Sequence, residues 1–213
     1  MKYLFPNALI CIFTKPPILG KCKTRLIPHL GEEGAAQLQE SLINKIINDL
    51  NDYKLCPFEV WQSEPSDYFT NLILKNDFDI DIKTQFGVDL GERMSNAFNA
   101  SLKRNKKVII IGSDCVEYSK QYLTSALQSL DNDNAVIIGP ASDGGYVLIG
   151  STAYYPEIFK DISWGEGCVF AQTLEKLSLL GITFSQLKVL NDIDTPNDLQ
   201  KASEFVGNSL HKL

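Results

Sequence analysis

Three aspartates of this sequence stand where acidic side chains could hold a divalent cation. Asp114 follows an apolar run, 107–111, and Gly112; Asp192 and Asp194 follow a second run, 182–190. Alternate residues of an extended segment point the same way, so Asp192 and Asp194 are expected on one side. Mg²⁺ is commonly held by a few carboxylates while substrate phosphates complete its shell. The three aspartates therefore predict a site for Mg²⁺ or Mn²⁺.

The position of Asp114 also marks it as a catalytic candidate. The run 107–111 is β-branched and too short for a helix, which is typical of a strand buried on both faces of a parallel sheet. Open α/β sheets bind ligands in the crevice at the carboxyl ends of such strands. The alternative is structural, because Ser113 or Asp114 could simply cap a turn or a helix.

Four cations and no acid lie between Lys15 and Arg25, the other two being Lys21 and Lys23. Three prolines and two glycines keep the segment 15–31 out of regular structure, and it follows the first apolar run directly. We expect this loop to bind the oxygens of a diphosphate or triphosphate, since ammonium and guanidinium groups both suit phosphate. The alternative is a solvated basic loop. Neither a Walker loop nor a dinucleotide fingerprint follows the run.

Two glycine-containing turns are further candidates for contact with a substrate. Asp89 lies in a turn that enters a helix, where backbone amides can meet an anion, although Asp89 could equally be the N-cap of that helix. Asp143, Gly144 and Gly145 form a tight turn in which a ligand could approach the backbone and Asp143 could bind sugar hydroxyls. A hairpin turn without any function is the alternative.

Trp164 lies in a glycine-flanked segment before a helix, so we expect it in a lid over the same crevice. The alternative for Trp164 is a place in the hydrophobic core, which is the default for tryptophan.

The remaining sequence predicts the elements that position these residues. Hydrophobic patterning indicates helices at 32–50, 67–74, 89–103, 119–130, 168–180 and from 195, and strands at 8–13, 58–62, 80–85, 107–111, 135–138, 147–149 and 182–190. Strands that alternate with helices predict an α/β fold. The length of 213 residues suits one domain, 1–213.

Composition excludes several classes of function. The net charge is −6, whereas binding to a nucleic acid backbone needs a basic face. No apolar run reaches the length of a membrane span. The five cysteines are scattered, without a Cys-x-x-Cys pair, so neither a disulfide framework nor a zinc site is expected. These features predict a cytoplasmic protein.

Five segments of the sequence together resemble the DUF2064 family, glycosyltransferase-like proteins also called radical-SAM/selenodomain-associated transferase 1. The segments are 13–26, 89–94, 111–115, 139–146 and 192–199. The resemblance implies the GT-A fold of nucleotide-diphospho-sugar transferases, a three-layer sandwich around a mostly parallel sheet. It also implies that Lys23 and Arg25 contact nucleotide phosphates and that Asp114, Asp192 and Asp194 take the metal.

The implied activity is transfer from a nucleotide sugar or nucleoside triphosphate to a small acceptor. Glycosyl transfer is ranked first. Nucleotidyl transfer is the alternative, because the family is similar to guanylyltransferases that act on phosphorylated acceptors. A third alternative is a nucleotide-binding protein without turnover, because two positions depart from the family pattern. Val116 replaces a usual proline, and Gly165–Gly167 replaces a usual serine or threonine.

Overall fold

The computed structural model describes residues 3–76, 78–130 and 135–206. Seven strands form one sheet in the order β3-β2-β1-β4-β6-β5-β7. The strands are β1 (Ala8–Thr14), β2 (Phe58–Gln62), β3 (Asp81–Thr84), β4 (Lys107–Gly112), β5 (Val136–Pro140), β6 (Tyr146–Ser151) and β7 (Phe184–Gln186).

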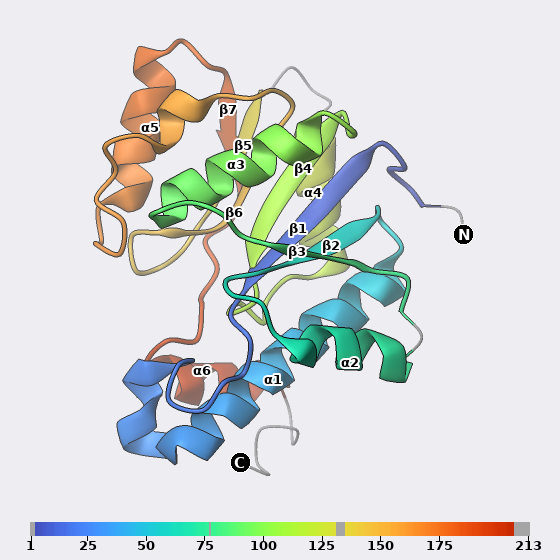
Figure 1. Cartoon of the computed structure of the whole chain (residues 1–213). Coiled ribbons are helices and arrows are strands. Elements are labelled where there is room, and N and C mark those ends of the chain that lie inside the picture. Colours follow the sequence, from blue (N-terminus) through green and yellow to red (C-terminus); the bar gives the residue numbers. More distant parts are fainter. Residues whose placement is uncertain (1–2, 77, 131–134, 207–213) are drawn as a thin grey trace.

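Helices cover both faces of this sheet (Figure 1). They are the α-helices α1 (Ile27–Tyr53), α2 (Asp67–Asn76), α3 (Leu90–Leu102), α4 (Lys120–Ser129), α5 (Val169–Leu179) and α6 (Pro196–Val206), with the short 3₁₀ helices η1 (Thr24–Leu26) and η2 (Pro156–Phe159). The predicted α/β class and mostly parallel sheet are confirmed, because β6 alone of these seven strands runs antiparallel to its neighbours.

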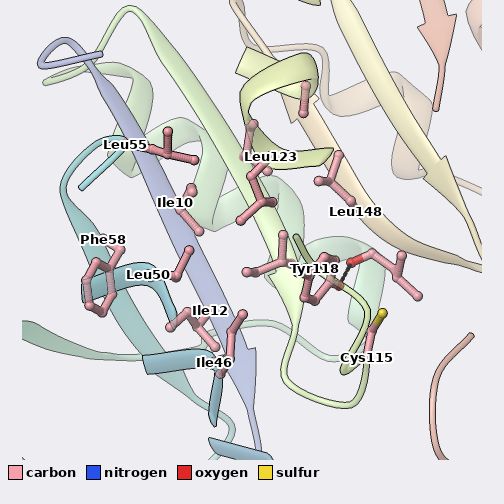
Figure 2. Close-up of a cluster of buried hydrophobic side chains, with 14 of the residues drawn as sticks. Ile10, Ile12, Ile46, Leu50, Leu55, Phe58, Cys115, Tyr118, Leu123 and Leu148 are labelled. Atoms are coloured by element: carbon pink, nitrogen blue, oxygen red, sulfur yellow. Dashed lines mark hydrogen bonds between the residues drawn. The ribbon is translucent and has the colours of Figure 1, made fainter. Parts of the chain in front are cut away.

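The alternation of side chains along the central strands divides the core into two layers. Ile10 and Ile12 of β1 face α1, α2 and α4, whereas Leu9 and Cys11 face α3 and α5. Figure 2 shows part of the first layer, where Ile46 and Leu50 of α1 meet β1. A third, smaller cluster joins α1 to α6, which lie together at the foot of Figure 1.

Tyr118 fixes the segment that follows β4 in place. Its ring is 2% exposed, and its hydroxyl donates a hydrogen bond of 2.6 Å to the carbonyl of Val147 in β6, drawn as a dashed line in Figure 2. The buried bond ties residues 115–118 to the neighbouring strand. Asp114 therefore lies in a short segment after β4 that is held in place by this bond.

Two boundaries differ from the sequence prediction. Residues 24–30, predicted as irregular loop, form η1 and the first turn of α1, where Pro28 is tolerated; Gly31, with φ of +72°, is non-helical, so the long helix starts after it at Glu32, as predicted. Strand β7 is shorter than the predicted 182–190. Pro140, at the end of β5, has no N–H to donate to a neighbouring strand, and the pairing of β5 with β6 is irregular at Gly139 and Pro140. After β7, the chain meets the end of β5 again through an isolated bridge between Ala141 and Leu190.

None of the helices within the described ranges combines the length and apolar character needed to cross a membrane.

Candidate functional site at the carboxyl edge of the sheet

A cavity of about 640 Å³ lies at the carboxyl edge of the sheet. Each parallel strand of the first half contributes the residue that follows its end. Lys15 follows β1, Ser63 follows β2, Gln85 follows β3, and Ser113 with Asp114 follows β4. The cavity therefore occupies the place where open α/β sheets bind ligands.

The segment that leads into α6 runs antiparallel beside Asp114. Cys115 and Asp192 form an isolated antiparallel bridge, and the amide of Ile193 donates to the carbonyl of Asp114 at 3.0 Å. Ile193 is 1% exposed and points into the core, whereas Asp192 and Asp194 both line the cavity. The predicted alternation is confirmed, and all three aspartates reach one site.

Lys23 lies between two of these carboxylates. Its backbone is left-handed, with φ of 47°, and its side chain is only 3% exposed. The ammonium lies 2.8 Å from Asp114 Oδ1 and 3.1 Å from Asp194 Oδ1, and donates to the carbonyl of Ile193 at 2.6 Å. Hydrogen bonds to Ile193 and Asp194 use two of the three donors of the ammonium, and the contact with Asp114 is an ion pair.

The surroundings keep Lys23 charged. Burial lowers the pKa of this amine, but the carboxylates of Asp114 and Asp194 together outweigh burial and raise the pKa above its ordinary value. Contact between Lys23 and phosphate stays a prediction: Lys23 lines the cavity, and its ammonium is shared between these two carboxylates.

The carboxylates are not fully neutralised by Lys23. Burial, together with the negative charges of Asp143, Asp194 and Asp114, raises the pKa of Asp192 to about 6. Oxygen ligands with an excess of negative charge fit a hard divalent cation.

The aspartates suit a divalent cation that also takes ligands from a bound substrate. Over residues 3–76, 78–130 and 135–206, no group of three or more His, Cys, Asp and Glu side chains could by itself hold a metal ion. Lys23 meets both Asp114 and Asp194 at their Oδ1 atoms. One or two carboxylates together with phosphate oxygens are a usual Mg²⁺ site.

Gln39 forms the buried floor between the first and fourth strands. Its amide nitrogen donates to Thr14 Oγ1 at 3.2 Å, to the carbonyl of Lys15 at 3.1 Å and to Ser113 Oγ at 3.4 Å. The hydroxyl of Ser113 donates in turn to Thr14 Oγ1 at 2.8 Å. Gln39 is 3% exposed and lies on α1, so it links the start of the basic loop to Ser113, which follows β4 and precedes Asp114.

The cations of the basic loop separate into two groups. Lys15, Lys23 and Arg25 line the cavity, and Arg25 Nη1 lies 3.8 Å from Asp194 Oδ2. Lys21 does not line it; its ammonium is exposed and lies 3.4 Å from Glu64 Oε2. The prediction that Lys21 binds phosphate therefore lacks support from its position.

Asp89 also lies outside the cavity lining. Its carboxylate accepts from the amide of Glu92 at 2.8 Å and caps α3, which is the structural alternative that the sequence offered.

Gly144 likewise lies outside the lining. A side chain at Gly144 would collide with the carbonyl of Gly167, and the φ of +89° is unfavourable for other residues. The close packing of two loops therefore explains why this residue is a glycine.

The opposite wall of the cavity comes from the β5–β6 hairpin and the segment before α5. Asp143, Gly145, Tyr146 and Trp164 all line it, the first two and Trp164 being candidates from the sequence. The rings of Tyr146 and Trp164 meet edge to face, with centroids 6.3 Å apart. Trp164 is half-buried and packs on Gly91 of α3, so it is a wall of the cavity rather than a core residue.

Sequence reasoning missed several lining residues, notably Gln39, Ser63, Gln85 and Arg93. Signals for three of them were present. Gln39 is a polar residue on the apolar stripe of its helix, and Ser63 and Gln85 follow strand ends as Asp114 does. Arg93 lies one turn beyond Asp89, but only the folded helix shows that it reaches the cavity.

Known structures share this architecture. A protein from Desulfovibrio desulfuricans G20, provisionally named a nucleotide-diphospho-sugar transferase, is 31% identical over 96% of this chain and 90% of its own, with a TM-score of 0.87. The inositol-1-phosphate CTP transferase of T. maritima is 14% identical over 94% of this chain and 95% of its own, with a TM-score of 0.60.

Glucosyl-3-phosphoglycerate synthase from Mycobacterium tuberculosis, solved with Mn²⁺ and UDP, is 11% identical over 92% of this chain and 75% of its own, with a TM-score of 0.56. The two distant structures share the fold alone. A comparison with curated proteins finds no match.

The fold is therefore that of the nucleotide-diphospho-sugar transferases, as the resemblance implied. The family described as "Uncharacterized protein conserved in bacteria (DUF2064)" matches residues 54–166, more than half of the sequence. With the same five segments assembled around one cavity, this chain belongs to the DUF2064 family.

Proposed function

We propose that this protein is a divalent-metal-dependent transferase that binds a nucleotide sugar and transfers its glycosyl group to a small acceptor. One observation carries the proposal: a cavity at the carboxyl edge of the sheet brings the cations Lys15 and Arg25 together with Asp114, Asp192 and Asp194. Phosphate oxygens and a divalent cation together balance such a set of charges.

The chain's own residues would act by position and charge. Arg25 and Lys15 would bind the diphosphate and stabilise the negative charge that grows on it as the bond to the sugar breaks. An acceptor hydroxyl would form the new bond to the anomeric carbon and lose its proton, and the nucleoside diphosphate would leave. Mg²⁺ or Mn²⁺, held by the aspartates, would supply charge neutralisation at the leaving phosphates.

Nucleotidyl transfer is the second candidate. In that reaction an acceptor phosphate attacks the α-phosphorus of a nucleoside triphosphate and pyrophosphate leaves. The observation in its favour is that two cations of the loop, Lys15 and Arg25, both line the cavity beside Lys23, which suits a longer phosphate chain. Glycosyl transfer is ranked first because the family resemblance favours it.

A thermal-shift screen tests both candidates. Nucleotide sugars, nucleoside diphosphates and triphosphates are each added with and without Mg²⁺; a ligand at 100 times its Kd stabilises by about 2.7 kcal/mol. We expect stabilisation only with metal, and its loss in Asp114→Asn but not in Lys21→Ala, whose side chain lies outside the cavity. A triphosphate that outperforms nucleotide sugars would favour nucleotidyl transfer.

Binding without any transfer or hydrolysis would favour the nucleotide-binding protein instead. Absence of metal-dependent binding would refute the proposal.

The compartment that we propose is a reducing cytoplasm. All five cysteines are free, and four of them are buried.

A further inference from the structure

Arg93 is a cation of the cavity that the proposed function does not use. The sequence has three arginines. Arg104 lies 2.9 Å from the carboxylate of Glu59, and Arg25 lies 3.8 Å from that of Asp194. Within the part of the chain that the structure describes, Arg93 has no carboxylate partner, although it is half-buried and lines the cavity.

The guanidinium of Arg93 is held by the loop before α3. Its Nε donates to the carbonyl of Gly87 at 3.1 Å. A side chain at Gly87 would lie 2.7 Å from the backbone nitrogen of Arg93, so only glycine lets the loop approach so closely. Of the five N–H groups of a guanidinium, the other four remain for a ligand.

Two more side chains of α3 fix this loop. Asn96 Nδ2 donates to the carbonyl of Phe86, and Glu92 Oε2 accepts from the amide of Val88, both at 2.8 Å. The orientation of Arg93 is therefore set before a ligand arrives, which reduces the entropy lost on binding.

Arg93 and the phosphate-binding cations reach the cavity from different faces of the sheet. Helix α3 packs on the same face as α5, and Trp164 covers its first turn at Gly91. Arg25 is part of η1 and Asp194 lies just before α6, and these two helices pack with α1 on the other side of the molecule, where α1 and α6 are seen together in Figure 1. The cavity thus has a second cationic end, with the apolar side chains of Leu90 and Trp164 beside it.

We propose that Arg93 binds an oxyanion, a carboxylate or a phosphate, on the second substrate. The proposal rests on the proposed function, in which the nucleotide phosphates take the end at Arg25. A fixed guanidinium in a half-buried cavity binds such groups through two parallel hydrogen bonds. The acceptor would therefore be an anionic small molecule.

The three arginines allow a direct test by ¹H–¹⁵N NMR of their side-chain Nε–H groups. The protein is first saturated with UDP and Mg²⁺, and separately with CTP and Mg²⁺, and then titrated with inorganic phosphate or with acetate. We expect the nucleotide to shift the Arg25 signal, and the added anion to shift the Arg93 signal. Arg104, paired with Glu59 and absent from the cavity lining, is the internal control.

Two variants separate anion binding from loop support. Arg93→Gln should weaken binding of the added anion at least tenfold and leave nucleotide affinity within about twofold. Asn96→Ala removes a bond to the same loop but leaves the guanidinium of Arg93 in place, so it should weaken anion affinity much less than Arg93→Gln does. Whichever of phosphate and acetate binds more tightly identifies the oxyanion.

The outcomes distinguish the two proposals. If neither nucleotide binds, the proposed function fails, while phosphate titration of the free protein still tests Arg93 through its own signal. If anions do not shift Arg93, or if Arg93→Gln weakens nucleotide binding instead, the acceptor subsite is refuted. Equal losses of anion affinity in Arg93→Gln and Asn96→Ala would also refute it, because the effect would then come from the loop.

Discussion

The ammonium of Lys23 lies 2.8 Å from Asp114 Oδ1, so a cation of the chain already occupies part of the proposed metal site. A divalent ion that approaches the same carboxylate meets the repulsion of this charge. We predict that Lys23→Met binds Mn²⁺ without nucleotide at least tenfold more tightly than the wild type does. Tenfold corresponds to about 1.4 kcal/mol, a small part of the interaction of close charges at a protein surface.

Electron paramagnetic resonance of free Mn²⁺ measures this affinity. Lys21→Met removes a cation of the same loop that contacts Glu64 rather than the aspartates, so it is the matched control. Lys23→Met should also be less stable by on the order of 2 kcal/mol, because Asp114 and Asp194 lose a buried partner but are about 40% exposed and can be rehydrated. Unchanged Mn²⁺ affinity would show that Lys23 does not restrict the site.

Asp114→Asn tests the role of this carboxylate in the reaction. We expect transfer to fall by about 10²–10³-fold, the usual effect of losing one preorganised electrostatic contact. The fold should persist, since Lys23 keeps Asp194 and the carbonyl of Ile193 as partners. Steady-state kinetics with circular dichroism as a folding check gives the answer, and transfer at the wild-type rate would remove Asp114 from the mechanism.

Gln39→Leu tests the buried floor of the cavity. The substitution removes three buried hydrogen bonds of the amide, among them the one to the carbonyl of Lys15, and should reduce stability by about 1–3 kcal/mol. Because Gln39 also joins Thr14 to Ser113, nucleotide affinity should fall as well. Urea denaturation and calorimetry measure the two effects. Gln37→Leu, an exposed glutamine of the same helix, should change neither.

The cysteines give a prediction about pH. Burial raises the pKa of Cys11, Cys56 and Cys115 to about 12, so these thiols stay protonated at pH 8. Cys168 is half-exposed and should be the fast-reacting thiol with an aromatic disulfide reagent. Cys168→Ser should abolish the fast phase; a fast phase that persists would contradict the buried positions.

The same thiols affect stability at high pH. Their ordinary pKa is 9.0, so the unfolded chain loses protons first and the free energy of unfolding should fall as pH rises from about 9 toward 12. Chemical denaturation across this range measures the decline.

Local patterning was sufficient for most of the fold. The strand 58–62 was predicted to the residue, because polar side chains interrupt apolar and aromatic ones there at strand spacing and turn residues follow. The end of the sheet was not, since β7 pairs with β5 only as far as Ile138 and Gln186, and Pro140 beyond it has no N–H for the ladder. Such pairing depends on a strand almost fifty residues away, which local periodicity does not report.

The candidate site could be predicted where one rule applied, that polar residues after parallel strands meet at one edge. This rule placed Lys15, Asp114 and Asp192 in the cavity. It did not give the direction of individual side chains. Lys21 and Lys23 are two residues apart in the loop, yet one is exposed beside Glu64 and the other is buried between two aspartates. The left-handed backbone at Lys23 makes this difference, and no residue type signals it there.

Gly91 and Trp164 test the wall of the cavity. A methyl group at Gly91 would lie 2.6 Å from the indole of Trp164, too close for contact without movement. Alanine normally stabilises a helix relative to glycine by about 0.5–1 kcal/mol. We predict that Gly91→Ala shows no such gain, because it displaces Trp164 toward solvent, and that nucleotide affinity falls several-fold if the indole contacts the ligand.

Fluorescence reports the displacement, since the chain has two tryptophans and the other, Trp61, is 7% exposed in the core. We expect the emission maximum of Gly91→Ala to shift to longer wavelength, and the shift to persist when Trp61 is also replaced by phenylalanine. The double variant Gly91→Ala/Trp164→Leu should recover the stability expected for alanine, because the smaller side chain leaves room for the methyl group. If Gly91→Ala alone is already stabilised and its emission is unchanged, the contact between Gly91 and Trp164 does not set the wall of the cavity.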